Sequence, residues 1–382
     1  MTYYGVVAFG LSMAQIACVI TDFGFNLSAT YKISQSRNDT VFVNKIIGGV
    51  IACKLILLIA VCIGLGTYIM LQTKYPGHQL FLGLMLLTVL GQTFQPIWFF
   101  QGIEQMVYIT IYTVMSRIIY VVMVLTLVDS PGSYNWIAFS NGIASLLAAG
   151  TGLSILLYKG YSIQWPGVAF VKQLFRESSE FFLSRAALAT YSAGGAFFLG
   201  LFSSPAQVAY YSAAEQLYKG ARSLFEPVSQ ALYPHMAQNK NFKLFFKILS
   251  IAILAGAIIT IAGIFTGNFF IQLFFGTEFT EAYPILIIFL IAYLISIPSV
   301  LLGYPFLGAI GQIQLANRSV IYAGIVQISL LGFCYLTNHN SGVQIAMTVL
   351  SVESIVLTIR VFWARQYYKK IKKDQELAPT AY

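Results

Sequence analysis

The chain has 382 residues, of which 58% are hydrophobic and only 9% are charged. A soluble globular domain has roughly a quarter of its residues charged, so this composition excludes a soluble protein and indicates an integral membrane protein. The net charge of +9 does not indicate a nucleic-acid partner, because the excess cations lie in short connections where membrane topology already requires them.

Long apolar segments follow one another along the whole chain. A helix needs about 20 apolar residues to cross the hydrocarbon core of a bilayer, and eleven segments meet this requirement. The sequence therefore predicts an all-α integral membrane protein with about eleven transmembrane helices. The predicted spans are residues 3–26, 46–71, 80–103, 107–128, 136–158, 181–202, 206–233, 248–275, 282–303, 319–337 and 343–366.

The basic residues between these spans predict the orientation. Alternate gaps, counted back from the C-terminus, hold fifteen Lys and Arg residues, whereas the opposite gaps hold only Lys74. Positive charge accumulates in cytoplasmic connections, so the C-terminus is predicted to be cytoplasmic. An odd number of spans then places Met1 outside, although it has no basic flank and no cleavable signal pattern. We therefore expect that a first helix of a twelve-span protein is missing.

The longest polar connection, at about 159–180, predicts a division into two helical bundles. The N-terminal bundle covers residues 1–160 with about five spans, and a cytoplasmic connecting segment covers 161–180. The C-terminal bundle covers 181–366 with about six spans, and a basic cytoplasmic tail covers 367–382. Four cysteines lie inside the spans without metal-ligand spacing, so packing is their expected role. They are Cys18, Cys53, Cys62 and Cys334.

Six of the 22 cations remain when the fifteen on the cytoplasmic side and Lys74 are set aside. They are Lys54, Arg117, Arg185, Lys219, Arg222 and Arg360. Each costs about 2.5–3.5 kcal/mol at the centre of a bilayer if it faces lipid. Arg185 and Arg360 lie about one turn from the cytoplasmic end, so we expect their side chains to snorkel to the interface. The other four are candidate cavity residues.

The span at 206–233 has the densest set of charges. Glu215, Lys219, Arg222 and Glu226 follow the spacing i, i+4, i+7, i+11, which places them within an arc of about 60° on one continuous helix. They could form the neutralising pairs Glu215–Lys219 and Arg222–Glu226 that join two helices. The interpretation that we favour is one wall of a hydrated, ion-binding cavity.

Other embedded polar residues extend this picture. Thr110, Thr113, Arg117 and Tyr120 form a polar stripe on the fourth span, and Glu353 shares a face of the last span with Arg360. Asp22 lies near a helix C-terminus, where a carboxylate is unfavourable. It has either a role in a turn or a cation partner such as Lys54. Three prolines within spans should introduce kinks. They are Pro96, Pro227 and Pro298.

Two local motifs carry a resemblance to a known family. They are ITDFGFNLSATYKIS at 20–34 and PIWFFQGIEQMVYIT at 96–110. Both resemble the Wzx O-antigen flippases, the polysaccharide-transporter branch of the MOP superfamily that also contains the MATE exporters and the lipid II flippases. The motif residues are Asp22, Phe23, Gly24, Trp98, Phe99, Phe100, Gln101 and Gly102.

This resemblance implies a MATE-like fold of twelve helices in two bundles around a central cavity. It implies a transporter without catalytic, metal or cofactor sites in the inner membrane of a bacterium. Its cargo would be a glycan on undecaprenyl diphosphate, moved from the cytoplasmic to the periplasmic leaflet by alternating access. Polysaccharide polymerase and chain-length proteins, together with membrane lipid, are the expected partners.

On this interpretation the embedded charges divide into two groups. The cations expected to bind the diphosphate are Lys54, Arg117, Lys219 and Arg222, and the acids available for coupling to a proton or Na⁺ gradient are Asp22, Glu215, Glu226 and Glu353. Two alternatives stay open. A MATE-like exporter of cations or drugs would favour carboxylates in an apolar cavity, and a membrane glycan polymerase would need a substantial outer loop with paired catalytic groups.

Overall fold

The computed structural model describes residues 1–377, except for the side chains at 184, 188, 191, 192, 237, 239 and 370–377. Every regular element in this range is helical, which confirms the predicted fold class. The chain forms two compact units, the first from Thr2 to Ala189 and the second from Thr190 onward. The boundary between the units falls inside a long helix. This helix begins at Val168, within the segment 161–180 that was predicted to connect the bundles, and it continues past the boundary.

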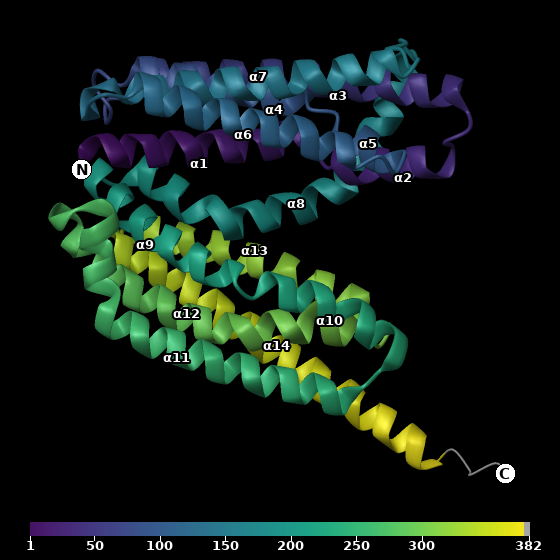
Figure 1. Cartoon of the computed structure of the whole chain (residues 1–382), viewed down its shortest axis with the longest axis vertical. Helices are drawn as coiled ribbons and strands as arrows, with labels where there is room; N and C mark the ends of the chain where they lie inside the picture. The colour runs from purple at the N-terminus through teal and green to yellow at the C-terminus, as the bar shows by residue number, and fades with distance from the viewer. Residues whose placement is uncertain (378–382) are drawn as a thin grey trace. The chain divides into compact units, whose positions relative to one another are not determined.

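The N-terminal unit is a bundle of long helices (Figure 1). Its elements are α1 (Thr2–Asp22), α2 (Phe25–Gln35), α3 (Thr40–Leu71), α4 (Gln79–Phe94), α5 (Ile97–Gly102), α6 (Val107–Leu127), the 3₁₀ turn η1 (Pro131–Tyr134), α7 (Asn135–Tyr158) and the first part of α8 (Val168–Phe202).

The C-terminal unit is a second helical bundle that begins with the end of α8. Its further elements are α9 (Pro205–Ser223), α10 (Glu226–Asn239), α11 (Phe242–Phe275), the 3₁₀ turn η2 (Thr277–Ala282), α12 (Tyr283–Leu301), the π-helix η3 (Leu302–Gly308), α13 (Ile313–Leu336) and α14 (Gly342–Leu377). The predicted tail at 367–382 begins as the end of α14, and its residues 378–382 lie outside the described residues.

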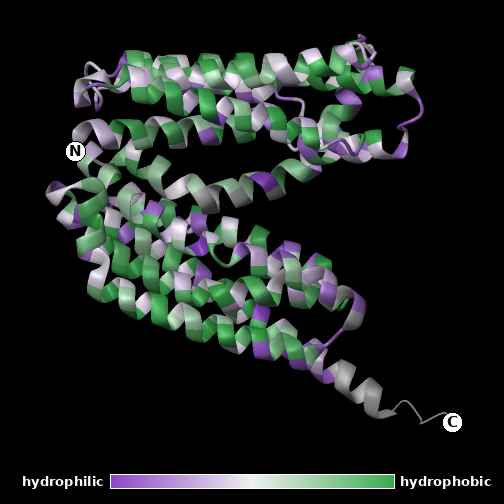
Figure 2. Cartoon of the chain, viewed as in Figure 1, coloured by the Kyte–Doolittle hydropathy of each residue, from purple (hydrophilic) through white to green (hydrophobic). Residues whose placement is uncertain are grey.

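Apolar residues dominate most of these helices (Figure 2). Nine helical segments in the described part of the chain are long and apolar enough to cross a membrane, and they coincide with nine of the eleven predicted spans. A multi-pass membrane protein is thereby confirmed. The predicted span at 181–202 lies within α8, but four of its side chains are not described, and its described stretch Ala193–Phe202 is a shorter apolar helix. The predicted span at 206–233 is divided between α9 and α10, and neither of these helices meets the same criteria.

Helices α4 and α7 pack closely because glycines remove side chains from their interface. A Cβ atom at Gly91 would lie 2.5 Å from the backbone carbon of Ser145, and one at Gly142 would lie 2.6 Å from Leu87. Small residues let membrane helices approach one another, so that dispersion forces act over a large contact area. This pair therefore forms a tightly packed part of the N-terminal bundle.

The two sequence motifs fold against each other at one end of the N-terminal bundle. The Thr30 hydroxyl donates to the Trp98 carbonyl oxygen at 3.0 Å, and Arg37 Nε donates to the Gly102 carbonyl oxygen at 2.9 Å. The same guanidinium hydrogen-bonds Glu104 at 2.7 Å and lowers the pKa of that carboxyl. These contacts fix α2 against α5.

The break between α1 and α2 is a strained turn. Phe23 adopts a φ of 44° and Gly24 a φ of 82°, and a bulky residue at positive φ costs about 1–3 kcal/mol. Aromatic packing offsets this cost, because the Phe23 ring lies 4.6 Å from that of Phe182 and 4.7 Å from that of Phe175. A side chain at position 24 would collide with Phe181.

Three further breaks interrupt spans. Pro96 separates α4 from α5, and Leu224 and Phe225 separate α9 from α10, with Pro227 in the first turn of α10. Pro96 matches a predicted kink, whereas the chain ends one helix before Pro227 and begins another, so that Pro227 does not kink a continuous helix. Helix α12 continues through Pro298 to Leu301, and its irregularity comes later, at Gly303 in η3, where ψ is −113°.

The close packing of α4 on α7 gives a stability test. Gly91→Ala should destabilise the protein by about 1–3 kcal/mol, because the added methyl group collides with the backbone of α7. Gly83→Ala on the same helix is the matched control, since nothing lies within 4 Å of the added atom, and helix propensity favours Ala by about 1 kcal/mol. Thermal unfolding of detergent-purified protein measures both. Equal melting temperatures for the two variants would contradict this packing.

Candidate functional site

A polar cavity of about 300 Å³ lies inside the N-terminal bundle. Residues from every α-helix of this bundle, α1 to α8, line it. The lining residues are Gln15, Cys18, Val19, Asp22, Asn26, Lys54, Gln92, Thr93, Gln95, Ile97, Thr113, Ser116, Arg117, Tyr120, Asn141, Ala144, Ser145, Ala148 and Arg185. Three of these side chains are cationic and one is a carboxylate, so two positive charges are in excess.

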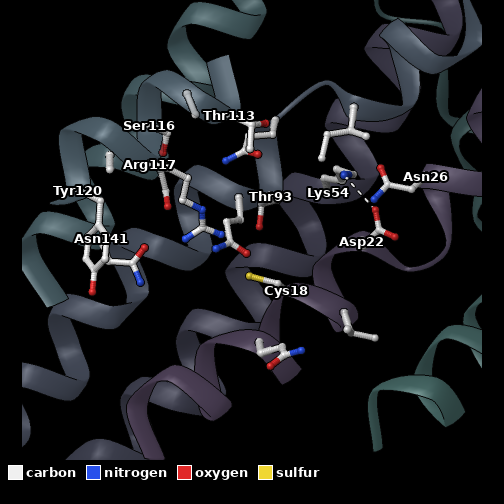
Figure 3. Close-up of a pocket in the computed structure, with 18 of the residues that line it drawn as sticks. Cys18, Asp22, Asn26, Lys54, Thr93, Thr113, Ser116, Arg117, Tyr120 and Asn141 are labelled. Atoms are coloured by element: carbon white, nitrogen blue, oxygen red, sulfur yellow. Dashed lines mark hydrogen bonds and ion pairs between the residues drawn. The ribbon is translucent and has the colours of Figure 1, made fainter. Parts of the chain in front are cut away.

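The carboxylate forms a buried ion pair with one of the cations. Lys54 Nζ lies 3.3 Å from Asp22 Oδ1, and the Lys54 side chain is only 3% exposed (Figure 3). Two roles were considered for Asp22, a turn or a pair with a cation, and the structure shows the pair with Lys54. The second carboxylate oxygen, Asp22 Oδ2, and the amide oxygen of Asn26 are buried without a hydrogen-bond partner among the described residues. Both atoms retain unused capacity to accept a hydrogen bond or bind a cation.

The two arginines of the cavity are not neutralised. Neither Arg117 nor Arg185 forms a hydrogen bond or ion pair with another described residue. Arg117 projects from α6 toward the middle of the cavity, beside Thr113, Ser116 and Tyr120 (Figure 3). The expectation that Arg185 snorkels is wrong, because this half-buried side chain borders the cavity. Thr110, the remaining residue of the predicted stripe, is not in the lining.

Neutral amides and hydroxyls complete the lining, and the sequence analysis did not single most of them out. They are Gln15, Gln92, Gln95, Asn141 and Ser145. Such side chains can hydrogen-bond water or a polar ligand within a membrane protein, where an unsatisfied polar group is costly. Their occurrence inside apolar spans was the available signal, although the sequence did not show that three separate helices bring them together.

The motif residues mostly build the surroundings of this cavity. Trp98, Phe99 and Phe100 are buried in the hydrophobic core beside α2 and α3. Gly102 packs on Ile33, and Gln101 is half-buried. Within the motif set, Asp22 alone lines the cavity, so the WFFQG segment positions helices rather than contacting a ligand there.

In the C-terminal bundle the embedded charges are paired. Lys219 Nζ lies 2.9 Å from Glu215 Oε2, as the pairing alternative expected. Arg222 Nη1 lies 3.6 Å from Glu353 Oε1 of α14 and donates to the Tyr218 hydroxyl at 3.2 Å. That hydroxyl donates to Glu353 at 3.4 Å. The Glu353 side chain is only 3% exposed, so this carboxylate is almost fully removed from solvent.

The second pair of that alternative, Arg222 with Glu226, does not form, because Arg222 pairs with Glu353. The arc of four charges assumed one continuous helix, but α9 ends at Ser223 and a new helix starts at Glu226. Glu226 is exposed in the first turn of the new helix.

Arg360 is buried as well, so the expectation that it snorkels is also wrong. Its guanidinium donates from Nε to Ser319 Oγ at 2.9 Å and from Nη1 to the Ser299 carbonyl oxygen at 2.7 Å. That carbonyl lies four residues before Gly303, whose ψ of −113° is not helical. Arg360 thus joins α14 to α12 and α13 beside the irregular segment.

A second cavity, of about 210 Å³, lies in this bundle beside the break between α9 and α10. It is lined by Arg222, Phe225, Glu226, Ser229, Gln230, Tyr293, Ser296, Ile297, Val300 and Leu301. The lining combines one cation and one acid with hydroxyl, amide, aromatic and aliphatic groups.

Comparisons with known proteins agree with this architecture. The family model of polysaccharide biosynthesis proteins matches residues 1–240. A protein of Escherichia coli (strain K12) assigned as an O-antigen transporter is 24% identical over 374 residues, which cover 95% of this chain and 88% of that protein. A protein of Shigella dysenteriae with the same assignment is 25% identical over 81% of this chain and 79% of its own length.

Solved structures share the fold. An inward-facing multidrug resistance MATE family transporter of the MOP superfamily superposes with a TM-score of 0.74 at 12% identity, covering 100% of this chain and 95% of that one. The lipid II flippase MurJ in an inward closed conformation gives 0.71 at 15% identity, with 95% and 85% covered. The matches confirm the resemblance predicted from residues 20–34 and 96–110. The chain therefore belongs to the family of polysaccharide biosynthesis proteins and has the fold of the MOP-superfamily transporters.

Proposed function

We propose that this protein is a flippase that moves undecaprenyl-diphosphate-linked O-antigen units from the cytoplasmic to the periplasmic leaflet of a bacterial inner membrane. The protein makes and breaks no covalent bond in this process. The names of its relatives and its fold support the general class of activity. The observation that carries the proposal is the excess of positive charge in the N-terminal cavity.

A diphosphate needs such a cavity because it cannot leave water without replacement of its hydration. Arg117 and Arg185 offer guanidinium groups that are not occupied by another described residue. Each guanidinium can donate two parallel hydrogen bonds to phosphate oxygens, and it is more weakly hydrated than an ammonium group. Glutamine and asparagine side chains around them can hydrogen-bond the remaining oxygens. The cavity thus offers a polar environment for the headgroup, while the polyprenyl chain stays in lipid.

The Lys54–Asp22 pair adjusts how tightly this environment holds an anion. Asp22 neutralises Lys54 while the cavity holds no diphosphate. A diphosphate that approaches Lys54 competes with Asp22, which weakens its binding and so permits release. The unpartnered Oδ2 atom of Asp22 could then take up a proton or a Na⁺ ion, which would couple the cycle to an ion gradient.

This assignment narrows the set of cargo-binding cations. Lys54 and Arg117 keep the role expected for them, and Arg185 joins them. Lys219 and Arg222 are held by Glu215 and Glu353, so they serve the internal structure of the C-terminal bundle before any contact with an anion. A MATE-like exporter of cations fits the charges less well, since two excess positive charges repel a cationic drug.

Removal of the free guanidinium groups tests the proposal in cells. Arg117→Ala and Arg185→Ala should each reduce surface polysaccharide at least about tenfold when they are expressed in a flippase-deficient strain, since a lost charged hydrogen bond costs roughly 1.5–3 kcal/mol. Arg117→Lys should retain part of the activity. Lipid-linked units should accumulate in the cytoplasmic leaflet, where a membrane-impermeant probe of sugars cannot reach them.

The matched control is Arg318→Ala, which removes an exposed arginine at the start of α13. It should leave surface polysaccharide unchanged. Immunoblots of membranes must show equal amounts of all variants. Full surface polysaccharide in the Arg117→Ala, Arg185→Ala double variant would refute a role for this cavity in transport.

The buried pair permits a test that separates folding from transport. Asp22→Asn or Lys54→Met alone should destabilise the protein by about 3–5 kcal/mol, because either change leaves an uncompensated buried charge. The double variant should recover most of the melting temperature but not the transport activity. Recovery of full transport together with stability would show that the pair is only structural.

A further inference from the structure

We propose that the second cavity, in the C-terminal bundle, is a carbohydrate pocket that receives a sugar ring of the transported glycan. This inference rests on the proposed function, since it assigns a subsite for the same cargo. The cavity is bounded by the end of α9, the first turns of α10 and the second half of α12. Four features of this cavity indicate a sugar as its ligand. They are its charge, its mixture of polar and apolar groups, an unsatisfied hydroxyl and its position at helix breaks.

The charge of the lining favours a neutral ligand. Arg222 is the cation of this cavity, and Glu353 pairs with it at 3.6 Å. Glu226 adds an exposed carboxylate to the lining. An anion such as a phosphate would therefore find no excess of positive charge, in contrast to the N-terminal cavity. A cation would lie beside the Arg222 guanidinium, which repels it.

The remaining polar groups match an array of sugar hydroxyls. Glu226 accepts hydrogen bonds, Gln230 both donates and accepts them, and the Ser229 hydroxyl can do either. The Ser296 hydroxyl donates to the Tyr293 carbonyl oxygen at 2.8 Å, so it can accept a hydrogen bond from a ligand. A sugar hydroxyl likewise donates and accepts, so several of them can be satisfied at once. This density of short polar groups on two helices serves a polyhydroxylated ligand better than a purely apolar one.

The cavity also has apolar surfaces of the kind that a sugar ring needs. The Phe225 ring is half-buried and contacts the ring of Tyr293 edge to face at 5.8 Å. The C–H groups on one side of a pyranose ring pack well against an aromatic face. Ile297, Val300 and Leu301 complete the lining. At about 210 Å³ the cavity lies below the range of roughly 300–1,000 Å³ for drug-sized ligands, so it suits a single ring.

An unsatisfied hydroxyl is the independent sign of a ligand. Tyr293 lines the cavity and is fully buried, and its hydroxyl has no hydrogen-bond partner among the described residues. A buried hydroxyl without a partner costs about 1–3 kcal/mol, so its retention calls for an explanation. A sugar hydroxyl in the cavity would supply the missing partner.

The backbone around the cavity is discontinuous in the manner of transporter binding sites. Helix α9 stops at Ser223 and α10 starts at Glu226, while α12 gives way to a π-helix at Leu302. Irregular backbone at membrane depth is tolerated where it is buried in protein or lines a polar cavity. Both interruptions adjoin residues of the lining, since Phe225 and Leu301 belong to it.

The test compares two probes on the full protein in lipid nanodiscs. One probe is undecaprenyl diphosphate, and the other is the same lipid with the glycan made by the strain that encodes the protein. Wild-type protein should bind the glycan-bearing lipid more tightly, and the ratio of the two dissociation constants defines its glycan preference. Tyr293→Phe and Gln230→Leu should each lower this preference by roughly 3- to 10-fold, with little change in the binding of undecaprenyl diphosphate.

Two controls make the result specific. Tyr322→Phe removes a tyrosine hydroxyl elsewhere in the C-terminal bundle, on α13, and should leave the preference unchanged. Arg117→Ala should weaken the binding of both probes by the same factor. Tyr293→Phe deletes a hydroxyl that makes no hydrogen bond with a described residue, so its melting temperature should not fall.

The outcomes separate this inference from the proposed function. If wild-type protein binds undecaprenyl diphosphate but Tyr293→Phe and Gln230→Leu keep the wild-type preference, the carbohydrate pocket is refuted and the proposed function stands. The same conclusion holds if wild-type protein shows no preference. If wild-type protein binds neither probe, the proposed function fails and the pocket fails with it.

Discussion

The high cost of an unpaired charge inside a bilayer organises this structure. Each embedded cation must have a carboxylate, a set of backbone and hydroxyl acceptors, or access to a polar cavity. Lys54, Lys219 and Arg222 have carboxylates, and Arg360 has a carbonyl and two serine hydroxyls. Arg117 and Arg185 lack such partners among the described residues, and both border the same cavity. The distribution of partners thus separates cations that hold the bundles together from cations that are free to bind an anion.

Hydropathy alone predicted most of the fold, because nine of the eleven segments depend only on the length and composition of a local window. It failed at residues 206–233. There Pro227 was interpreted as a kink within one helix, although the chain ends one helix at Ser223 and begins another at Glu226. Helical spacing was then extended across a break, which gave Arg222 the wrong partner. Its actual partner, Glu353, lies more than a hundred residues away in the sequence, so no local pattern could identify it.

The sequence predicted what kind of site the protein has, a polar cavity with cations, but not which residues line it. The embedded charges identified Lys54 and Arg117, since their cost is evident from sequence. The expected depth of Arg185 and Arg360 in the membrane did not predict where their side chains point. A residue near a helix end can point either to the interface or into the bundle. The glutamines and asparagines of the cavity became significant only when four helices brought them together. The aromatic WFF segment, which carried the resemblance, is part of the core.

Helix α6, which contributes one wall of the N-terminal cavity, is less buried than the other apolar spans of its bundle. Tyr112 is the only buried residue of this helix, which the structure describes in full, whereas α4 and α7 are packed through glycines. Its inner face bears Arg117, and its outer face bears exposed aliphatic side chains such as Ile111 and Ile118. Those aliphatic side chains face outward from the bundle, so that they suit contact with hydrocarbon rather than with a further protein layer. Arg117 is thus screened from the acyl chains of the bilayer by the width of a single helix.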